Sequence, residues 1–453
     1  MKKGFRLHIR DFGKIESANI DVAPVTFFVG DNNSGKSYLT ALLYTLLNLR
    51  LFHSGFNLCT NSEEYRWCET WLEQSLSPEM DGKQLITLDI ETQDRFQTLL
   101  NLILKENRSQ LVQMTFNSEV SIGEIYIEFL KQEELCIFTE KKQFPNDTKY
   151  SYSIFLKSRR FYRTTLISKS FNNTFVICYI LEILLKSNLL DNYMSPACFL
   201  PTSRTGFLLT YKSLLRSTIE DAYDISNLKT PRTELTRPCT DFLKNLASIS
   251  QENEDDRFQS LIDFIETKML SGHISISNEL PQSLIRYRPD GSDQELPMHL
   301  TSGVVTELTP LLLMLQYHSN MSALFIEEPE MSLHPGLQLE IARVLLRLHS
   351  SGLLVFVTTH SDTILQHVNN MLKLGALDDV QQNKIMEELG YTRDDLISAD
   401  EIEMYQFDVN PATQKTTIQK LEKGPYGFIV PSFNNALRHL LNISRRMEMD
   451  DDV

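Results

Sequence analysis

Hydrophobic and polar residues alternate at the start of the chain and then give way to a continuous apolar run. The alternation over residues 5–12 and 14–22 predicts two strands with one buried face. Residues 24–29 are almost entirely apolar, which predicts a strand that is buried on both faces. A glycine-containing loop follows, and residues 37–52 have the broad apolar face of a packed helix. Strand, loop and helix in this order are typical of an α/β protein.

The last third of the chain returns to the same pattern. Residues 323–328 and 353–360 begin as apolar runs rich in Leu, Phe, Val and Ile, and each precedes a helical pattern. Such runs indicate the buried strands of a parallel sheet with helices on its faces. We therefore expect one α/β core, made of residues 1–52 and 295–375, whose two parts meet in space.

The segment between these two parts has a different character. Residues 53–294 are predicted to form an insertion with a mixed lobe to about residue 200, a helical lobe over about 208–272 and a hairpin over about 273–294. Residues 376–453 contain the patterns of a strand pair and a helix. We expect them to form a small C-terminal α+β extension.

The loop after the third predicted strand matches the phosphate-binding pattern G-x-x-x-x-G-K-[ST] without a gap. Its backbone N–H groups would form a concave anion site at the start of a helix. Lys36 is expected to reach the β- and γ-phosphates of ATP, and the Ser37 hydroxyl is expected to ligate Mg²⁺. The predicted nucleotide-binding residues of this loop are Gly30, Asp31, Asn32, Asn33, Ser34, Gly35, Lys36 and Ser37.

Two adjacent carboxylates end the strand that is predicted over residues 323–328. A carboxylate at a strand end beside a phosphate-binding loop can hold Mg²⁺, and its neighbour can polarise the attacking water. We assign Glu327 to Mg²⁺ and Glu328 to catalysis. The alternative is an acidic strand end without chemistry. For Glu330 the sequence suggests no more than a cap on the following helix.

Two further segments complete a candidate site. The strand over residues 353–360 ends in His360, which can contact the γ-phosphate, and the alternative is a histidine without a special role. Ser302 and Gly303 lie where a helix is expected to begin, and a helix N-terminus favours anions. Taken alone, Thr301-Ser302-Gly303 is an ordinary helix cap.

Composition narrows the class of protein. The net charge of −15 argues against a protein that coats DNA over its whole surface, although residues 157–163 form a local basic patch. Six scattered cysteines without a C-x-x-C pair argue against disulfides or a zinc site and fit a reducing, cytoplasmic location. No signal peptide is expected. The apolar stretch 175–185 is too short for a membrane span and contains Glu182.

The order of these motifs resembles that of the ABC-type AAA ATPases of the OLD, RecF and SMC class. The phosphate-binding loop is followed by a signature segment at 300–304, FIEEPE at 325–330, SLHP at 332–335 and the switch residue His360. The segment 199–207, FLPTSRTGF, and the hairpin ahead of the signature look like those of AAA15-like ATPases. These include the ATPase subunits of bacterial anti-phage systems such as Septu, PARIS and some retrons.

The resemblance implies a P-loop ATPase head, and two such heads would sandwich two ATP molecules. Each ATP would be bound by the P-loop of one chain and by Ser302 and Gly303 of the other, so we expect at least a dimer. Arg204 is expected to brace the insertion or to help sense nucleotide. A complete ATPase head without an obvious effector indicates a sensor or scaffold that holds a separate effector protein, such as a nuclease.

Three other functions are weaker interpretations. An OLD relative would carry a nuclease domain with a D-x-D motif for metal ions. The strand pair predicted after His360 contains no such motif, so no intrinsic nuclease is expected. A RecF-like or short SMC-like DNA-handling ATPase is the main alternative, although the acidic charge and the missing coiled coil weigh against it. The FIEEPE segment and the large insertion do not fit a transporter ATPase, so no membrane partner is expected.

Overall fold

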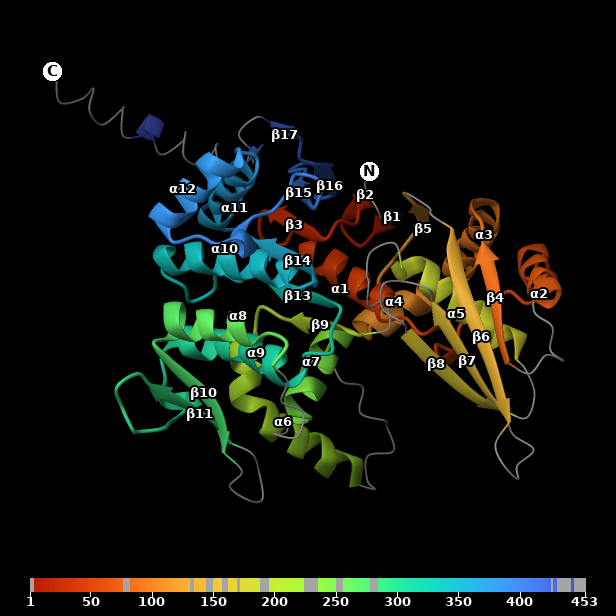
Figure 1. Ribbon diagram of the computed structural model, residues 1–453, viewed down its shortest axis with the longest axis horizontal. Coiled ribbons are helices and arrows are strands. Elements are labelled where there is room, and N and C mark those ends of the chain that lie inside the picture. Colours follow the sequence, from red (N-terminus) through yellow and green to blue (C-terminus); the bar gives the residue numbers. More distant parts are fainter. Residues whose placement is uncertain are drawn as a thin grey trace.

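Figure 1 shows the computed structural model, in which a large central sheet runs through the molecule with helices on both of its faces. The residues that the structure describes are 4–75, 82–130, 134–143, 150–156, 162–168, 172–187, 195–223, 235–249, 256–277, 284–424, 427–429 and 441–443. The predicted α/β class is confirmed.

The central sheet has nine strands in the order β5-β1-β2-β16-β15-β3-β14-β13-β9. The strands are β1 (Phe5–Phe12), β2 (Ile15–Asp21), β3 (Val25–Gly30), β5 (Glu124–Phe129), β9 (Ala197–Leu200), β13 (Ala323–Glu327), β14 (Leu354–Thr359), β15 (Ile402–Val409) and β16 (Thr416–Lys420). The strands that the sequence predicts at both ends of the chain are therefore confirmed as members of one sheet.

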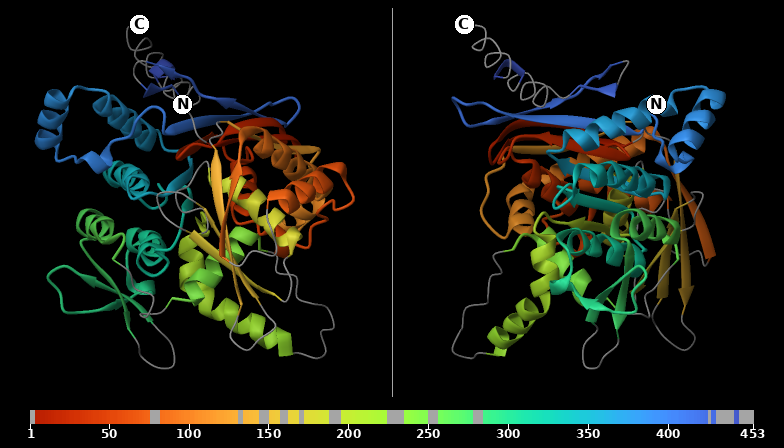
Figure 2. Two further views of the ribbon diagram at one scale, coloured as in Figure 1. Left: turned by 45° about the vertical axis from the view of Figure 1, so that its right-hand side comes forward. Right: turned by 90° about the vertical axis from the view of Figure 1, so that its left-hand side faces the viewer.

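Helices pack on this sheet from both sides, as the two views of Figure 2 also show. Their bounds are α1 (Lys36–Leu47), α2 (Glu63–Ser75), α3 (Ile90–Glu106), α4 (Arg108–Phe116), α5 (Asn173–Ser187), α6 (Arg204–Tyr223), α7 (Arg237–Ala247), α8 (Gln259–Ile265), α9 (Gly303–Tyr317), α10 (Pro335–Ser350), α11 (Asp362–Gly375) and α12 (Asp379–Leu389). The helix predicted over 37–52 ends at Leu47. A 3-10 turn then covers Leu51–His53.

Five neighbouring strands, β9, β13, β14, β3 and β15, run parallel to one another. Their carboxyl ends therefore meet at one edge of the sheet, where open α/β sheets bind ligands. The residues that directly follow β3, β13 and β14 are the phosphate-binding loop, Glu328 and His360. The expectation that the two parts of the core meet in space is confirmed along these strands.

Side chains on β3 alternate between two hydrophobic cores. Phe28 packs in a core with α1 and helices of the insertion, whereas Phe27 and Val29 pack in a second core with α9, α10 and α11. All three side chains are fully buried. The apolar run of the third strand thus reflects burial on both faces, as the sequence predicts.

The C-terminal strand pair is part of the central sheet. β15 pairs antiparallel with β16, as expected, but it also pairs in parallel with β3, the strand before the phosphate-binding loop. Strands β5 and β9, which come from the segment 53–294, join the same sheet. The division into lobes stays a prediction, and the sheet draws strands from all four segments. Pairing between segments this far apart leaves no local trace in the sequence.

The insertion carries a second sheet, which lies at the right of Figure 1. Its four strands are antiparallel in the order β4-β6-β7-β8, with bounds Gly82–Leu88, Leu135–Gln143, Tyr150–Leu156 and Tyr162–Ser168. Within the segment 273–294, where a hairpin is predicted, β10 (Gly272–Ser277) pairs antiparallel with β11 (Leu284–Pro289). A π-helical turn at Glu266–Leu270 precedes it.

Short elements complete the chain. They are β12 (Leu296–Pro297), the 3-10 turns Met298–Leu300 and Arg393–Asp395, β17 (Lys423–Gly424) and β18 (Gly427–Phe428). Most of the basic patch 157–163 and most of the helix that is predicted in the C-terminal segment, near 432–443, lie outside the described residues. Among the helices of the described ranges, none combines the length and the apolar character that crossing a membrane requires.

Candidate active site

The phosphate-binding loop connects β3 to α1 and depends on two glycines with positive φ. Gly30 has φ +136°, and a Cβ at this position would clash with the carbonyl oxygen of Phe407 on β15. Gly35 has φ +96° and immediately precedes α1, where a Cβ would lie 3.2 Å from the Ile15 side chain. Only glycine fits both the dihedral angles and the space. The path of the loop is therefore fixed by β15 and by the turn between β1 and β2.

Lys36 lies inside this loop and is only 6% exposed. Its Nζ donates hydrogen bonds to the carbonyl oxygens of Gly30 and Asp31 at 2.9 and 2.8 Å. Burial lowers the pKa of Lys36 to about 8, against the opposing effect of nearby carboxylates, of which Glu328 contributes most. Phosphate oxygens are acceptors of the same kind as these carbonyl oxygens, so the loop fits a phosphate group.

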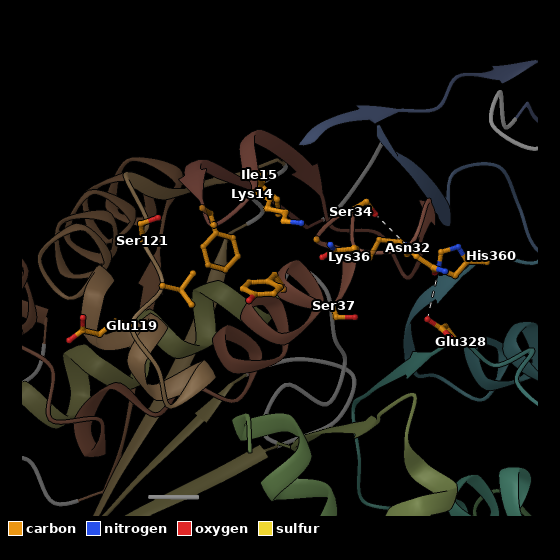
Figure 3. A pocket seen from close by; sticks show the side chains of 16 residues that line it. Lys14, Ile15, Asn32, Ser34, Lys36, Ser37, Glu119, Ser121, Glu328 and His360 are labelled. Atoms are coloured by element: carbon orange, nitrogen blue, oxygen red, sulfur yellow. Dashed lines mark hydrogen bonds and ion pairs between the residues drawn. The ribbon is translucent and has the colours of Figure 1, made fainter. Parts of the chain in front are cut away.

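A pocket of about 460 Å³ opens beside the loop, within the usual size range of small-molecule sites. Figure 3 shows how it brings Lys36, Ser37, Glu328 and His360 together from three different strand ends. The lining residues are Phe12, Gly13, Lys14, Ile15, Asn32, Asn33, Ser34, Gly35, Lys36, Ser37, Tyr38, Glu119, Val120, Ser121, Glu328 and His360. Of the predicted loop residues, Gly30 and Asp31 lie outside this lining.

Glu328 occupies a strained position at the end of β13. Its φ is +44°, in the left-handed region that residues other than glycine rarely adopt. The backbone N–H of Glu328 donates to the carbonyl oxygen of Thr358 at 2.8 Å, which ties the turn to β14. Oε1 of Glu328 lies 3.8 Å from Nε2 of His360, the dashed contact in Figure 3. Strain of this kind persists where the surrounding structure fixes it, and it is frequent at functional sites.

Glu327 and Ser37, the two predicted Mg²⁺ ligands, differ in their surroundings. Ser37 is exposed and lines the pocket, where its hydroxyl and the Glu328 carboxylate are the hard oxygen donors that Mg²⁺ prefers. Glu327 is 8% exposed and does not line the pocket. Its Oε2 accepts hydrogen bonds from the N–H and the hydroxyl of Thr202, both at 3.3 Å. The magnesium role of Glu327 stays a prediction.

The carboxylate of Glu330, for which the sequence predicts only a helix cap, holds the main chain of His360. Oε1 of Glu330 accepts a hydrogen bond from the backbone N–H of His360 at 2.6 Å, and Oε2 accepts one from Thr359 Oγ1 at 2.9 Å. The following helix, α10, is instead capped by His334. Burial lowers the pKa of His360, and the positive charge of Lys36 lowers it further. Both effects favour the neutral form of the imidazole.

The predicted signature residues lie outside the pocket. Ser302 caps α9 by accepting a hydrogen bond from the backbone N–H of Val305 at 3.4 Å. Ser302 and Gly303 are both exposed, and a Cβ on Gly303 would meet Ser332 at 3.5 Å. The structure thus brings the signature beside the SLHP segment of its own chain, and it does not bring the signature to the P-loop of its own chain.

One wall of the pocket is formed by residues outside the sequence motifs. Tyr38 is stacked against Phe116 at 4.9 Å between ring centroids, and the backbone of Ser121 accepts a hydrogen bond from Gly13 N–H at 3.0 Å. This wall comes from the loop between α4 and β5, which is more than 80 residues from the P-loop in sequence. The pairing of β1 with β5, together with these contacts, brings the two segments together.

Three comparisons with known proteins bear on this site. A family model described as AAA ATPase domain (AAA_15) matches residues 5–365, which is most of the chain. The comparison with curated proteins gave no match.

Three of the similar solved structures are heads of SMC proteins. One is an SmcHead bound to the C-winged helix domain of ScpA, with 13% identity, a TM-score of 0.37 and 92% and 98% of the two chains covered. Another is the SMC head domain from Thermotoga maritima, with 11% identity, a TM-score of 0.33 and 93% and 100% covered. A third, derived from Pyrococcus furiosus, has an extended coiled coil and is bound to the C-terminal domain of ScpA, with 12% identity, a TM-score of 0.36 and 97% and 98% covered.

Proposed function

Because the chain belongs to the AAA ATPase domain family, we propose that it binds and hydrolyses ATP with Mg²⁺ as a dimer. We further propose that this cycle holds and releases a separate effector, such as a nuclease, in bacterial anti-phage defence. The observation behind the dimer is the separation of two nucleotide-binding elements. Glu328 and His360 share a pocket with the P-loop, whereas Ser302 and Gly303 are exposed outside it. A second copy would supply the missing signature.

The surface around the signature supports the same proposal. Leu300 is 64% exposed, Met331 is 41% exposed and Leu339 is 39% exposed. Leu300 directly precedes the signature segment Thr301–Gly303, and Met331 directly precedes the SLHP segment. Exposed apolar side chains grouped in this way are typical of a surface that another protein covers. In the proposed dimer this surface would face the P-loop of the partner.

Four side chains of the pocket, together with the N–H groups of the loop, then have proposed roles. Lys36 and the N–H groups of the loop bind and orient the phosphates of the substrate. Glu328 takes a proton from the attacking water as the general base. Neutral His360 forms a hydrogen bond at the γ-phosphate and so responds to its presence. Mg²⁺, when bound, would neutralise part of the charge on the phosphates, with Ser37 as its ligand in the loop.

The separate effector is proposed because the strands after the switch histidine belong to the central sheet. β15 and β16, which follow the switch histidine, complete the central sheet and carry no D-x-D motif for a nuclease. All six cysteines are free thiols, which fits a reducing compartment, and we propose that the protein acts in the cytoplasm.

Native mass spectrometry of the Glu328→Gln protein tests this function. The variant is purified gently from its own host with ATP and Mg²⁺, so that the ATP-bound assembly persists. A fixed stoichiometry with a second protein is the expected result, and the mass identifies the effector. A homo-oligomer that carries nucleic acid and no second protein would contradict the effector role and favour a DNA-handling ATPase. The Lys36→Ala protein, prepared in parallel, shows which species require nucleotide.

A further inference from the structure

Arg204 is almost completely buried, although it is the first residue of helix α6. Its side chain is 3% exposed. A cation at a helix N-terminus is disfavoured by the helix dipole, and burial of a guanidinium adds a desolvation cost. Burial accordingly lowers the pKa of Arg204, against the effect of four surrounding glutamates. A position with these two penalties needs specific partners.

Two of these partners are the carbonyl groups of the catalytic turn. Nη1 of Arg204 donates a hydrogen bond to the carbonyl oxygen of Glu327 at 2.6 Å, and Nη2 donates one to that of Glu328 at 3.1 Å. Thr202, two residues earlier, holds the Glu327 carboxylate. The segment after β9 therefore holds both the main chain of the turn and the side chain of Glu327.

The opposite side of the turn is fixed by β14, through the hydrogen bond from Glu328 N–H to Thr358. The turn is thus held between its two neighbouring strands, β9 and β14. This arrangement explains how Glu328 retains its left-handed backbone conformation, since such a conformation persists only where its surroundings fix it. Removal of one of the two supports would release the carboxylate from its position.

The third partner of Arg204 lies on the signature helix. Nη2 of Arg204 forms an ion pair with Oε1 of Glu307 at 2.5 Å, and Nε donates to the carbonyl oxygen of Glu307 at 3.3 Å. Thr205 donates its hydroxyl to the other oxygen of the same carboxylate at 2.5 Å. Glu307 is 3% exposed and lies five residues after Ser302, within the first two turns of α9.

We propose that Arg204 is a positioning residue for ATP hydrolysis, which fixes the peptide between Glu327 and Glu328 and couples it to the signature helix through Glu307. This inference rests on the proposed function. Because one guanidinium contacts both elements, a displacement of α9 is transmitted to the turn that carries Glu328. In a dimer, the signature of a chain acts on the ATP of its partner, so Arg204 couples the two ATP sites.

The test replaces the ion pair without leaving a buried charge unpaired. In Arg204→Met/Glu307→Met, two apolar side chains of similar length take the place of the pair, an exchange that proteins often tolerate. The hydrogen bonds to Glu327 and Glu328 are lost. A misplacement of reacting groups by about 1 Å costs on the order of 100-fold in rate. We therefore expect kcat to fall by roughly that factor, while ATP affinity stays within about threefold of the parent because the P-loop is untouched.

A purely structural role gives a different result. If Arg204 only braces the fold, the double variant has the same kcat and the same melting temperature as the parent. That result would overturn the inference. Glu307→Gln supplies an intermediate case, because Arg204 keeps its bonds to the turn and loses only the charged anchor. We expect its kcat to lie between those of the parent and the double variant.

Arg347→Met is the matched control. Arg347, whose side chain is 14% exposed, forms an ion pair with the fully buried Asp395 at 2.7 Å, on the far end of α10 and without contact to the site. Its loss is expected to lower the melting temperature and to leave kcat unchanged. An equal fall in kcat in this control would assign the effect to general destabilisation.

Hydrogen exchange separates this inference from the proposed function. In the nucleotide-free double variant, amides over residues 327–333 and 301–306 are expected to exchange faster than in the parent, while the core strands do not. Unchanged exchange in both segments overturns the coupling, whatever the ATPase activity. A parent protein that fails to hydrolyse ATP, with exchange altered as expected, would instead count against the proposed function alone.

Discussion

The P-loop pocket and the signature surface, which we propose to be the two halves of a nucleotide site, differ in how complete they are within one chain. The pocket gathers residues from the ends of β3, β13 and β14, and Lys36 at its base is buried. The signature surface consists of the exposed Ser302 and Gly303, flanked by the exposed Leu300. One half is assembled by folding, whereas in the proposed dimer the other would be completed by a partner chain.

This difference follows from where each half lies on the sheet. Strands β3, β14 and β13 are direct neighbours, so their carboxyl ends place the P-loop, His360 and Glu328 within contact distance. The signature begins helix α9, which packs on one face of the sheet, and its N-terminus lies beside Ser332. Proximity within the sheet is therefore enough to bring the residues of the first half together. Only association of two chains would complete the second.

The largest effect is expected from Glu328→Gln. The amide keeps the shape of the side chain but cannot take a proton, and loss of a general base costs roughly 10²–10⁴-fold in rate. ATP affinity should remain close to that of the parent, since Lys36 and the loop are unchanged. Steady-state hydrolysis and equilibrium nucleotide binding measure the two quantities. Hydrolysis at the parental rate would move the general base to another residue.

Lys36→Ala should have the next largest effect, and on binding rather than on the chemical step. The loss of a buried, hydrogen-bonded cation that faces a charged ligand costs about 2–5 kcal/mol, which corresponds to roughly 30-fold or more in affinity. Isothermal titration with a non-hydrolysable ATP analogue and Mg²⁺ measures this change. Unchanged affinity would show that the loop does not hold the phosphates.

A smaller effect, on hydrolysis without a loss of binding, is expected from Gly303→Asp. The new carboxylate would meet the phosphates of the partner's ATP, and we expect about a tenfold to 100-fold lower rate from like-charge repulsion at close range. A Cβ at this position meets only ordinary contact distances, so the fold should be retained. Gly303→Ala is the matched control for the added side chain, with a nearly parental rate expected.

Mixing the Gly303→Asp protein with the Lys36→Ala protein distinguishes an ATP site formed between two chains from one formed within a single chain. In a mixed dimer, the intact P-loop of the Gly303→Asp chain meets the intact signature of the Lys36→Ala chain, so one working site is restored. Hydrolysis by the mixture should therefore exceed that of either variant alone. No recovery in a mixture that is shown to contain mixed dimers would contradict the arrangement in trans.

The P-loop half could be predicted from the sequence because its chemistry lies in short, contiguous segments. A strand, two glycines at fixed spacing and Lys36 are local features, and each has its own physical reason. The same holds for the acidic end of β13 and for His360 at the end of β14. That these strand ends meet at one site then follows from the general rule that open α/β sheets bind ligands at the carboxyl ends of their strands.

The supports of the site could not be predicted in the same way. Arg204 is visible in the sequence as a charged residue after a strand, but its contacts with Glu307 and with the catalytic turn depend on the packing of α6 against α9. Glu330 resembles a helix cap until the register of β13 and β14 places it beside Thr359. The place of β15 next to β3 depends on pairing across more than 370 residues.

The smallest expected effect is a pH dependence that reports on the buried half alone. Burial lowers the pKa of Lys36 from 10.5 to about 8 in the free protein, and only the protonated amine attracts phosphate. As pH rises through 8, the free protein loses this proton and must regain it on binding. ATP affinity should therefore fall by up to about tenfold per pH unit above 8.

The matched control for this pH dependence is Lys36→Arg, whose guanidinium stays charged over the whole range and should show affinity that changes little between pH 7 and 9. The lowered pKa has a second consequence of known sign. Between pH 8 and 10.5 the unfolded chain holds more protons at this residue than the folded one, so this group makes the free energy of unfolding rise with pH there. Titrations of the parent protein with ATP at pH 7, 8 and 9 test the expected fall in affinity. A parent affinity that is flat across this range would show that the amine is not buried when the nucleotide arrives, and would remove the contrast between the enclosed P-loop and the exposed signature.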